Sequence, residues 1–279
     1  MFKQNAIIIC LIMGITVASA AGAAEKRQCT PPNQLPSIET YYDSVSNLQG
    51  EYLKSGLHDL LATGSFVYDY KCIWSILNVT DQDPDNPDNV IELYTRRSVP
   101  KIDRDHGQND PDSWNREHVW AKSHGFPDPK QYAYTDAHHL RPADRSVNTE
   151  RSNRDFSDGS GKRVQECPDC IKGYDYTWFP GSAVKGDVAR MMFYMATRYE
   201  GVDGDGGTPD LEIASFVTGK SEKGPQLGVL CDLYRWHQDD PVSDWERLRN
   251  ERVFTWQANR NPFIDHPEWV ESIWGGQCP

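Results

Sequence analysis

The stretch of sequence that decides the fold runs from Trp114 to Phe156. It begins with Trp114-Asn-Arg-Glu-His-Val-Trp120 and ends with Thr135-Asp-Ala-His-His-Leu-Arg-Pro-Ala-Asp-Arg-Ser-Val-Asn-Thr-Glu-Arg-Ser-Asn-Arg-Asp-Phe156. This stretch holds four of the chain's eight histidines, five arginines, and the lysines Lys122 and Lys130. The whole chain carries a formal charge of −12. Cationic and imidazole groups gathered in one stretch therefore indicate where the chemistry takes place. The same net charge argues against a generally basic protein that coats nucleic acid, so a polyanion would bind through a local patch.

Residue types within this stretch predict a strand, a loop, a second strand and a helix. Val119-Trp120 suits the first strand, Ala137–Leu140 suits the second, and Gly125-Phe-Pro-Asp-Pro129 suits the loop between them. Pro142 is expected to end the second strand, because proline lacks a backbone donor. Residues Ala143 to Asn153 can then continue as a helix.

Three side chains in this frame match the needs of phosphodiester hydrolysis. Glu117 is a hard oxygen ligand, Asn148 offers an amide oxygen, and His118 belongs to the residue type that titrates near neutral pH. We expect His118 to be the general base, and Glu117 with Asn148 to hold one Mg²⁺ ion, for which Mn²⁺ or Ca²⁺ could substitute. An arginine would clamp the phosphate, and the candidates are Arg116, Arg141 and Arg145.

This assignment carries a geometric condition. Adjacent side chains on a regular strand point to opposite faces, so Glu117 and His118 can face one site only at a strand end or a bulge. His138 and His139 have two interpretations: hydrogen bonding within the hairpin, which is favoured, or support of the active site.

The expected helix sorts its polar residues by face. Arg145, Asn148 and Arg151 share a face because they are spaced three residues apart. Asn153 follows Asn148 by five positions and is therefore expected to point away from that face. The helix and its flanks also carry acidic residues, so salt bridges within this segment are an alternative use for the arginines.

Three motifs in this order resemble the endonuclease I family of secreted and periplasmic nucleases, namely Asn115-Arg-Glu-His118, Asp136-Ala-His-His-Leu140 and Val147-Asn-Thr-Glu-Arg-Ser-Asn153. The similarity runs from the helix before Gly64, through the strand at Val90, to Asp240-Pro-Val-Ser-Asp-Trp-Glu246 and Asn259-Arg-Asn-Pro-Phe263. The resemblance implies an α+β fold: one mixed domain with a central ββα-metal finger (strand, loop, strand, helix) surrounded by helices.

The resemblance also implies the same roles for His118, Glu117 and Asn148. It implies cleavage of DNA with little sequence preference, with RNA as a further substrate and 5′-phosphate ends as products. Family members with a cysteine-bearing insertion between the base and the asparagine take an arginine from that insertion. This chain is shorter there, so that arginine has no secure counterpart and the three candidate arginines remain unranked.

The N-terminus has the pattern of a secretory signal. Lys3 precedes an apolar run from Ala6 to Val17, and the small residues Ala18-Ser-Ala-Ala-Gly-Ala-Ala24 follow it. Cleavage after Ala20 or Ala23 gives a signal peptide over residues 1–23 and a single nuclease domain over residues 24–279. The run is too short to span a bilayer. We therefore expect a secreted or periplasmic monomer without a membrane partner.

Six cysteines remain after such a cleavage: Cys29, Cys72, Cys167, Cys170, Cys231 and Cys278. An even number outside the cytoplasm predicts three disulfides, although fifteen pairings are possible. Cys167-Pro-Asp-Cys170 has the spacing of a redox motif or of half a zinc site. A structural bridge is favoured, because no second Cys/His pair has suitable spacing.

Apolar spacing predicts helices elsewhere, and two acidic loops raise the possibility of calcium. The helices are expected at Leu53, Leu57, Leu60 and Leu61; at Val188, Met191, Met192, Met195 and Tyr199; at Trp245, Leu248, Val253 and Trp256 behind a Ser243–Glu246 capping box; and after Pro267. A strand is expected over Val90–Tyr94. The loops Asp81–Asp88 and Asp203-Gly-Asp-Gly-Gly207 could bind calcium, but polar turns are favoured.

Two other classes of function remain open. A non-catalytic module that binds carbohydrate or nucleic acid would use exposed aromatic residues, and the chain has nine tryptophans. A zinc hydrolase would require a His-Glu-x-x-His spacing, whereas here Glu117 precedes His118 and Ala121 stands where the second histidine would fall.

Overall fold

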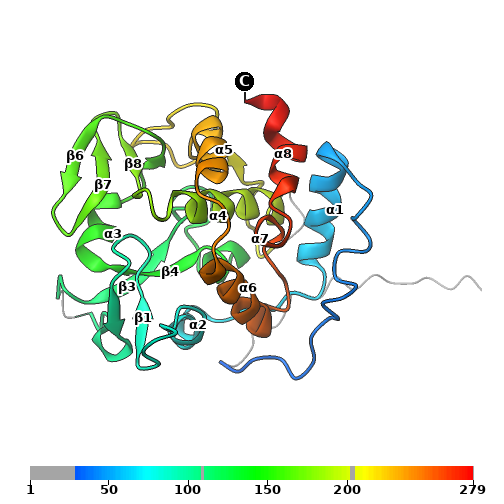
Figure 1. Ribbon diagram of the computed structural model, residues 1–279, viewed down its shortest axis with the longest axis horizontal. Helices are drawn as coiled ribbons and strands as arrows, with labels where there is room; N and C mark the ends of the chain where they lie inside the picture. Colours follow the sequence, from blue (N-terminus) through cyan, green and yellow to red (C-terminus); the bar gives the residue numbers. More distant parts are fainter. Residues whose placement is uncertain (1–28, 108–109, 202–204, 279) are drawn as a thin grey trace, which may run out of the picture.

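The computed structural model describes residues 29–107, 110–201 and 205–278 (Figure 1). The expected signal peptide, residues 1–23, lies outside the described residues. The α-helices are α1 (Gly50–Ala62), α2 (Ile73–Thr80), α3 (Arg145–Arg151), α4 (Lys185–Arg198), α5 (Leu230–Asp239), α6 (Asp244–Gln257), α7 (Pro262–Asp265) and α8 (Glu268–Trp274). Short 3₁₀ turns include η1 (Tyr70–Cys72) and η3 (Tyr132–Thr135). No helix within these residues is long and apolar enough to cross a membrane.

The strands form small separate sheets, as an α+β fold does. They are β1 (Asn89–Ile91), β2 (Ser98–Pro100), β3 (Trp114–His118), β4 (Leu140–Asp144), β5 (Asp155–Phe156), β6 (Gly161–Val164), β7 (Cys167–Gly173), β8 (Thr177–Phe179), β9 (Glu212–Ile213) and β10 (Gln226–Leu227). The pairs β1–β2 and β3–β4 are antiparallel, β9–β10 is parallel, and a four-stranded sheet has the order β5-β8-β7-β6. Figure 1 shows β3, β6, β7 and α3 on one side of the molecule and α1, α7 and α8 on the other.

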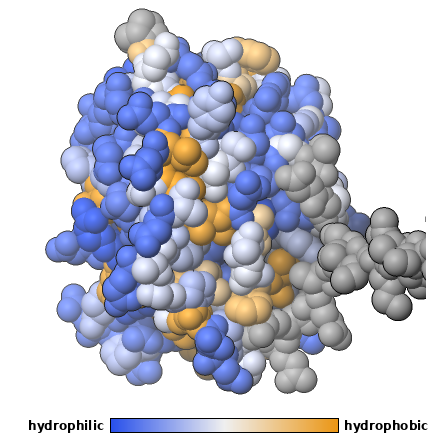
Figure 2. Space-filling model, turned by 90° about the vertical axis from the view of Figure 1, so that its right-hand side faces the viewer, coloured by the Kyte–Doolittle hydropathy of each residue, from blue (hydrophilic) through white to orange (hydrophobic). Residues whose placement is uncertain are grey.

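Helix α4 is the centre of the main core. Residues Gly186 to Arg198 of this helix are all buried, and the helix packs against α1, α5 and α7. The predicted apolar stripe of α4 is confirmed, and so are the capping box of α6 and the stripe of α1, apart from the half-buried Leu60. Figure 2, a view onto the side of α1 and α8, shows hydrophobic patches between hydrophilic side chains.

The central unit contains two strands and a helix, but its elements start and end at other residues than predicted. The first strand is Trp114–His118 rather than Val119-Trp120, and the second is Leu140–Asp144 rather than Ala137–Leu140. Pro142 lies inside the second strand, opposite Arg116. The proline is tolerated because β4 pairs with β3 on one side only, and on the other side the Pro142 carbonyl oxygen accepts a hydrogen bond from the Leu93 amide at 2.8 Å.

The helix of this unit is shorter than the expected Ala143–Asn153. Asp144 caps its start, accepting a hydrogen bond from the Val147 amide at 3.0 Å. The helix ends at Arg151, because Ser152 has a φ of 57°, which a continuing α-helix does not permit. The strand at Val90 is likewise shorter than expected and covers Asn89–Ile91.

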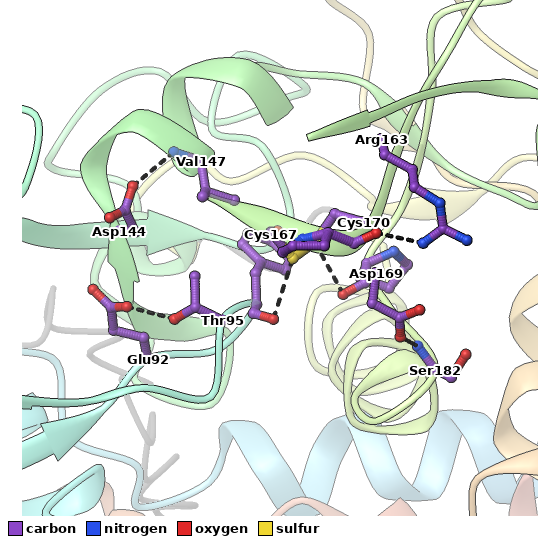
Figure 3. The surroundings of a disulfide bond; sticks show 12 residues. Glu92, Thr95, Asp144, Val147, Arg163, Cys167, Asp169, Cys170 and Ser182 are labelled. Carbon is purple, nitrogen blue, oxygen red and sulfur yellow. Dashed lines mark hydrogen bonds between the residues drawn. A yellow bond between two sulfur atoms is a disulfide. The ribbon is translucent and has the colours of Figure 1, made fainter. Parts of the chain in front are cut away.

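The three predicted disulfides are present: Cys29–Cys72, Cys167–Cys170 and Cys231–Cys278. The Cys167-Pro-Asp-Cys170 motif is therefore a bridge, and Figure 3 shows it beside Thr95, with Asp169 nearby contacting Ser182.

The acidic loops use their oxygens internally. Asp83 accepts a hydrogen bond from the Asp85 amide at 2.9 Å, and Asn86 accepts one from the Asp88 amide at 3.2 Å. Asp205 pairs with Arg198 at 2.7 Å, while Asp203 lies outside the described residues. Hydrogen-bonded turns of this kind agree with the favoured interpretation of polar turns.

Candidate active site

A cavity of about 410 Å³ lies where the end of β3, helix α3 and the turn η1 meet. We call it the active-site cavity. Its lining residues are Tyr70, Arg116, Glu117, His118, Ala121, Lys122, Ser123, Asn148, Arg151, Ser152, Asn153 and Lys223. Four of the six residues singled out from the sequence line it together: Arg116, Glu117, His118 and Asn148. Arg141 and Arg145 do not line it.

His118 meets the geometric condition because it is the last residue of β3. Its Nε2 lies 3.0 Å from the carbonyl oxygen of Tyr134. A carbonyl can only accept, so Nε2 carries the proton and Nδ1 keeps its lone pair. Burial, followed by the nearby His139, lowers the pKa of His118 well below its usual value. A neutral imidazole with a free Nδ1 is the form that a general base requires.

Glu117 is buried, and one of its two oxygens is already held. Its Oε1 accepts a hydrogen bond from the Tyr94 hydroxyl at 2.7 Å and lies 3.3 Å from Nη1 of Arg151. Burial raises the pKa of Glu117, whereas Arg151 and then Tyr94 oppose that shift. Its Oε2 has no hydrogen-bond partner among the described residues, so it remains free for a ligand in the cavity.

Asn148 presents its amide oxygen in a similar way. Its Nδ2 donates to Oδ1 of Asn115 at 2.7 Å, which orients the amide and leaves Oδ1 without a partner among the described residues. Glu117 and Asn148 thus offer one carboxylate oxygen and one amide oxygen to the same cavity. This set fits Mg²⁺, which usually takes one or two carboxylates and fills its remaining positions with water and phosphate oxygens.

The described residues contain no group of three or more His, Cys, Asp or Glu that could enclose a metal ion. Glu117 and Asn148 offer two oxygens at the cavity, so water and substrate would have to complete the coordination of a metal ion held there. Open coordination is the form expected of a magnesium ion that acts on phosphate.

The structure separates the three candidate arginines. Arg141 is buried and pairs with Asp81 at 2.7 Å, away from the cavity. Arg145 lies 3.3 Å from Asp105 and lines a different pocket on the outer side of α3. Arg116 alone of the three lines the active-site cavity.

Arg116 is held in place by aromatic rings rather than by a carboxylate. Its Cζ lies 3.5 Å from the ring centroid of Tyr70 and 4.1 Å from that of Trp74. Its Nη1 donates to the Tyr70 carbonyl oxygen at 2.6 Å. The described residues give it no ion pair within 4.0 Å, so its remaining N–H groups are free to bind an anion in the cavity.

Sequence reasoning missed several lining residues. The spacing places Arg151 on the same helical face as Asn148 but indicates no role for it. In the structure Arg151 contacts Glu117 and donates to the carbonyl oxygens of His118 and Val119. The expectation that Asn153 points away was wrong. The helix has ended two residues earlier, so helical spacing no longer applies.

Two further lining residues could not have been found by local spacing. Tyr70 precedes the central stretch by more than forty residues, and no motif there marks it. Lys122 lies within the stretch, and its Nζ donates to the Tyr134 hydroxyl at 2.8 Å. Its type and position were the only signal available.

His138 and His139 are buried and do not line the cavity. His139 Nε2 lies 2.8 Å from the Ala133 carbonyl oxygen, within the connection between the two strands. His138 Nε2 lies 3.1 Å from the carbonyl oxygen of Asn259, which follows α6. Each ring makes a hydrogen bond through Nε2, and only His139 makes that bond within the hairpin connection. Burial lowers the pKa of each to about 4.

Comparison with known proteins adds the following findings. The family model "Endonuclease I" matches residues 49–268. The chain is 45% identical over 263 residues to an extracellular ribonuclease of Bacillus amyloliquefaciens, covering 93% of this chain and 87% of the relative. It is 48% identical over 245 residues to an extracellular ribonuclease of Bacillus subtilis, covering 88% and 81%. An extracellular deoxyribonuclease of Aeromonas hydrophila is 31% identical over 133 residues, covering 47% and 48%.

Proposed function

Because the chain belongs to the endonuclease I family, we propose that it is a magnesium-dependent endonuclease that hydrolyses phosphodiester bonds of RNA, and of DNA as a second substrate. The observation that carries this proposal is the meeting of His118, Glu117, Asn148 and Arg116 in one cavity. The family excludes the alternative of a module without catalysis.

We propose RNA as the main substrate because of the names of the relatives and the share of this chain that each of them matches. The two relatives named extracellular ribonucleases share 45% and 48% identity and match most of this chain. The relative named deoxyribonuclease shares 31% identity and matches 47% of it. This order reverses the expectation from the motifs, which put DNA first.

Each lining residue has a proposed task in hydrolysis. Nδ1 of His118 takes a proton from the attacking water, while the Tyr134 carbonyl keeps the ring oriented through Nε2. Glu117 and Asn148 would hold the magnesium ion, which when bound supplies positive charge to the phosphate. Arg116 binds a phosphate oxygen and offsets the charge that develops there. We also propose that the cleavage products carry the phosphate on their 5′ ends.

The protein is secreted or periplasmic, as its extracellular relatives and three disulfides indicate. A signal peptide over residues 1–23, a mature nuclease domain over residues 24–279 and a monomeric state remain proposals.

The test is a cleavage assay with end-labelled RNA and DNA oligonucleotides of one sequence. We expect internal cleavage of RNA with Mg²⁺, weaker cleavage of DNA, and loss of both in EDTA with recovery on added Mg²⁺. His118→Ala serves as the catalytic control and should cleave at least a hundredfold more slowly. Undiminished cleavage in EDTA, or by His118→Ala, would refute the proposed mechanism.

A further inference from the structure

A stack of aromatic rings and guanidinium groups starts at the active-site cavity, whose lining includes Tyr70 and Arg116. The His118 and Tyr70 rings stack at 5.7 Å with an interplanar angle of 29°. Arg116 follows between Tyr70 and Trp74, and Arg104 lies beyond, its Cζ 5.3 Å from the Trp74 ring centroid. We call Tyr70, Arg116, Trp74 and Arg104 the aromatic–arginine stack. All four are half-buried, so each keeps some surface accessible to a ligand.

The inner part of this stack rests on rigid supports. Trp74 packs edge-to-face against the fully buried Trp114 of β3, with ring centroids 5.1 Å apart. Cys72, which lies between Tyr70 and Trp74 in the chain, is tied to Cys29 by a disulfide. A platform anchored in this way loses little conformational freedom when a flat ligand stacks on it.

The outermost group of the stack is the guanidinium of Arg104. The guanidinium of Arg104 has no hydrogen bond and no ion pair with the described residues, and its cation–π contact with Trp74 is a loose one. The backbone next to it is nevertheless fixed to the active-site strand, because the Asp105 amide donates to the Trp114 carbonyl oxygen at 2.7 Å. Arg104 is therefore held beside β3 with its planar head group available.

Charge decides which part of a nucleotide this place suits. Arg104 shares a pocket with Asp103, Asp105, Asp110 and Asp112. These carboxylates disfavour a phosphate there, whereas they can accept hydrogen bonds from the amino groups of a nucleobase. Arg116, which lines the active-site cavity and forms no ion pair within 4.0 Å with the described residues, is the place for the phosphate.

We propose that Trp74 and Arg104 form a subsite for the base of the nucleotide adjoining the scissile phosphate. This inference rests on the proposed nuclease function. The base stacks on the guanidinium plane of Arg104, which lies over the Trp74 ring, as unpaired bases of RNA stack on arginine side chains. Since a base inside a duplex is not free to do so, the subsite favours single-stranded substrate.

The experiment compares two substrates for each variant: single-stranded oligocytidine of ten nucleotides, whose bases carry an amino group, and bis(4-nitrophenyl) phosphate, a diester that has no base. The quantity measured is the ratio of kcat/KM on the oligonucleotide to kcat/KM on the small diester. We expect Trp74→Ala and Arg104→Ala each to lower this ratio by about tenfold, chiefly through KM. Trp74→Leu serves as a second variant that keeps apolar volume against Trp114 should Trp74→Ala fold poorly.

The matched control is Trp245→Ala. Trp245 is also half-buried and also lies near two arginines, Arg96 at 5.8 Å and Arg252 at 5.7 Å, but it belongs to α6 and is not part of the aromatic–arginine stack. Its ratio should stay at the wild-type value. An unchanged ratio in both Arg104→Ala and Trp74→Leu would overturn the subsite. If the wild-type protein hydrolyses neither of the two substrates, the proposed function itself is overturned instead.

Discussion

The hydroxyl of Tyr94 donates a hydrogen bond of 2.7 Å to the carboxylate of Glu117, the proposed magnesium ligand. Tyr94 is buried, and its ring packs edge-to-face against Trp178 at 5.6 Å. The hydroxyl therefore fixes one carboxylate oxygen and leaves the other to the cavity. Groups that orient a ligand in this way commonly influence metal affinity as much as some ligands do.

Tyr94→Phe removes that hydroxyl and keeps the ring. We expect the Mg²⁺ concentration for half-maximal cleavage to rise by about tenfold, because the carboxylate is less well oriented. A magnesium titration of the cleavage rate measures the effect, and the melting temperature should change little. Identical magnesium curves for wild type and Tyr94→Phe would contradict the role given to this hydrogen bond.

Removal of the general base and removal of a magnesium ligand should change the cleavage kinetics in different ways. His118→Ala is expected to lower turnover by about 10²–10⁴-fold while magnesium binding remains. Asn148→Ala should raise the magnesium requirement and recover part of its activity at high metal concentration. Calorimetry of Mg²⁺ binding together with cleavage rates separates the two outcomes. Loss of metal binding in His118→Ala with normal binding in Asn148→Ala would make His118 a ligand instead.

The three candidate arginines should give three distinct results. Arg116→Ala is expected to lower kcat/KM by about a hundredfold, since it removes a charge from the cavity. Arg145→Ala, outside the cavity, should lower it less than threefold. Arg141→Ala leaves the buried Asp81 with Arg249 as its one remaining ion-pair partner among the described residues and should lower the free energy of unfolding by about 3 kcal/mol. Comparable kinetic losses in Arg116→Ala and Arg145→Ala would reject this ranking.

Acid should destabilise the fold through its buried histidines. The pKa of His138 and that of His139 are about 4 in the folded protein, below the ordinary 6.5. Between these values the unfolded chain binds protons that the folded protein does not. The free energy of unfolding should therefore fall as pH drops from 6.5 to 4, by up to about 1.4 kcal/mol per pH unit for each histidine.

Denaturant unfolding at several pH values, for wild type and His138→Gln, tests this expectation. Glutamine can still donate a hydrogen bond toward Asn259 but does not titrate in this range. The variant should show a shallower dependence on pH than the wild type. Parallel curves would show that His138 does not contribute.

The disulfides should differ in what they contribute to stability. Cys231–Cys278 spans 47 residues and Cys167–Cys170 spans 3. Loop-closure entropy therefore predicts a loss of about 4 kcal/mol when the first is replaced by a pair of serines, and about 2 kcal/mol for the second. Melting temperatures of the two double variants give the comparison. An equal or greater loss for Cys167–Cys170 would show that packing around that bridge, rather than loop closure, sets its contribution.

The sequence by itself determined the centre of this protein. Glu117 and His118 are the last two residues of β3, and Asn148 lies on the helix that follows the paired strand β4, all within one short stretch. Local order brings such residues together, and three motifs in series were enough to predict the family. The residues at which the two strands begin and end could not be predicted from the sequence, because pairing across the sheet overrode the preference of Val119-Trp120 and Ala137–Leu140 for strands.

Only the tertiary structure decided what surrounds that centre. An arginine can serve a phosphate only if no carboxylate neutralises it, and this depends on which acidic residue folds beside it. Asp81, sixty residues away in the chain, forms an ion pair with Arg141. Arg116 instead lies between the rings of Tyr70 and Trp74, and the described residues give it no ion pair within 4.0 Å. Tyr94 likewise reaches Glu117 from another element. These contacts join distant segments through packing, and no local spacing encodes them.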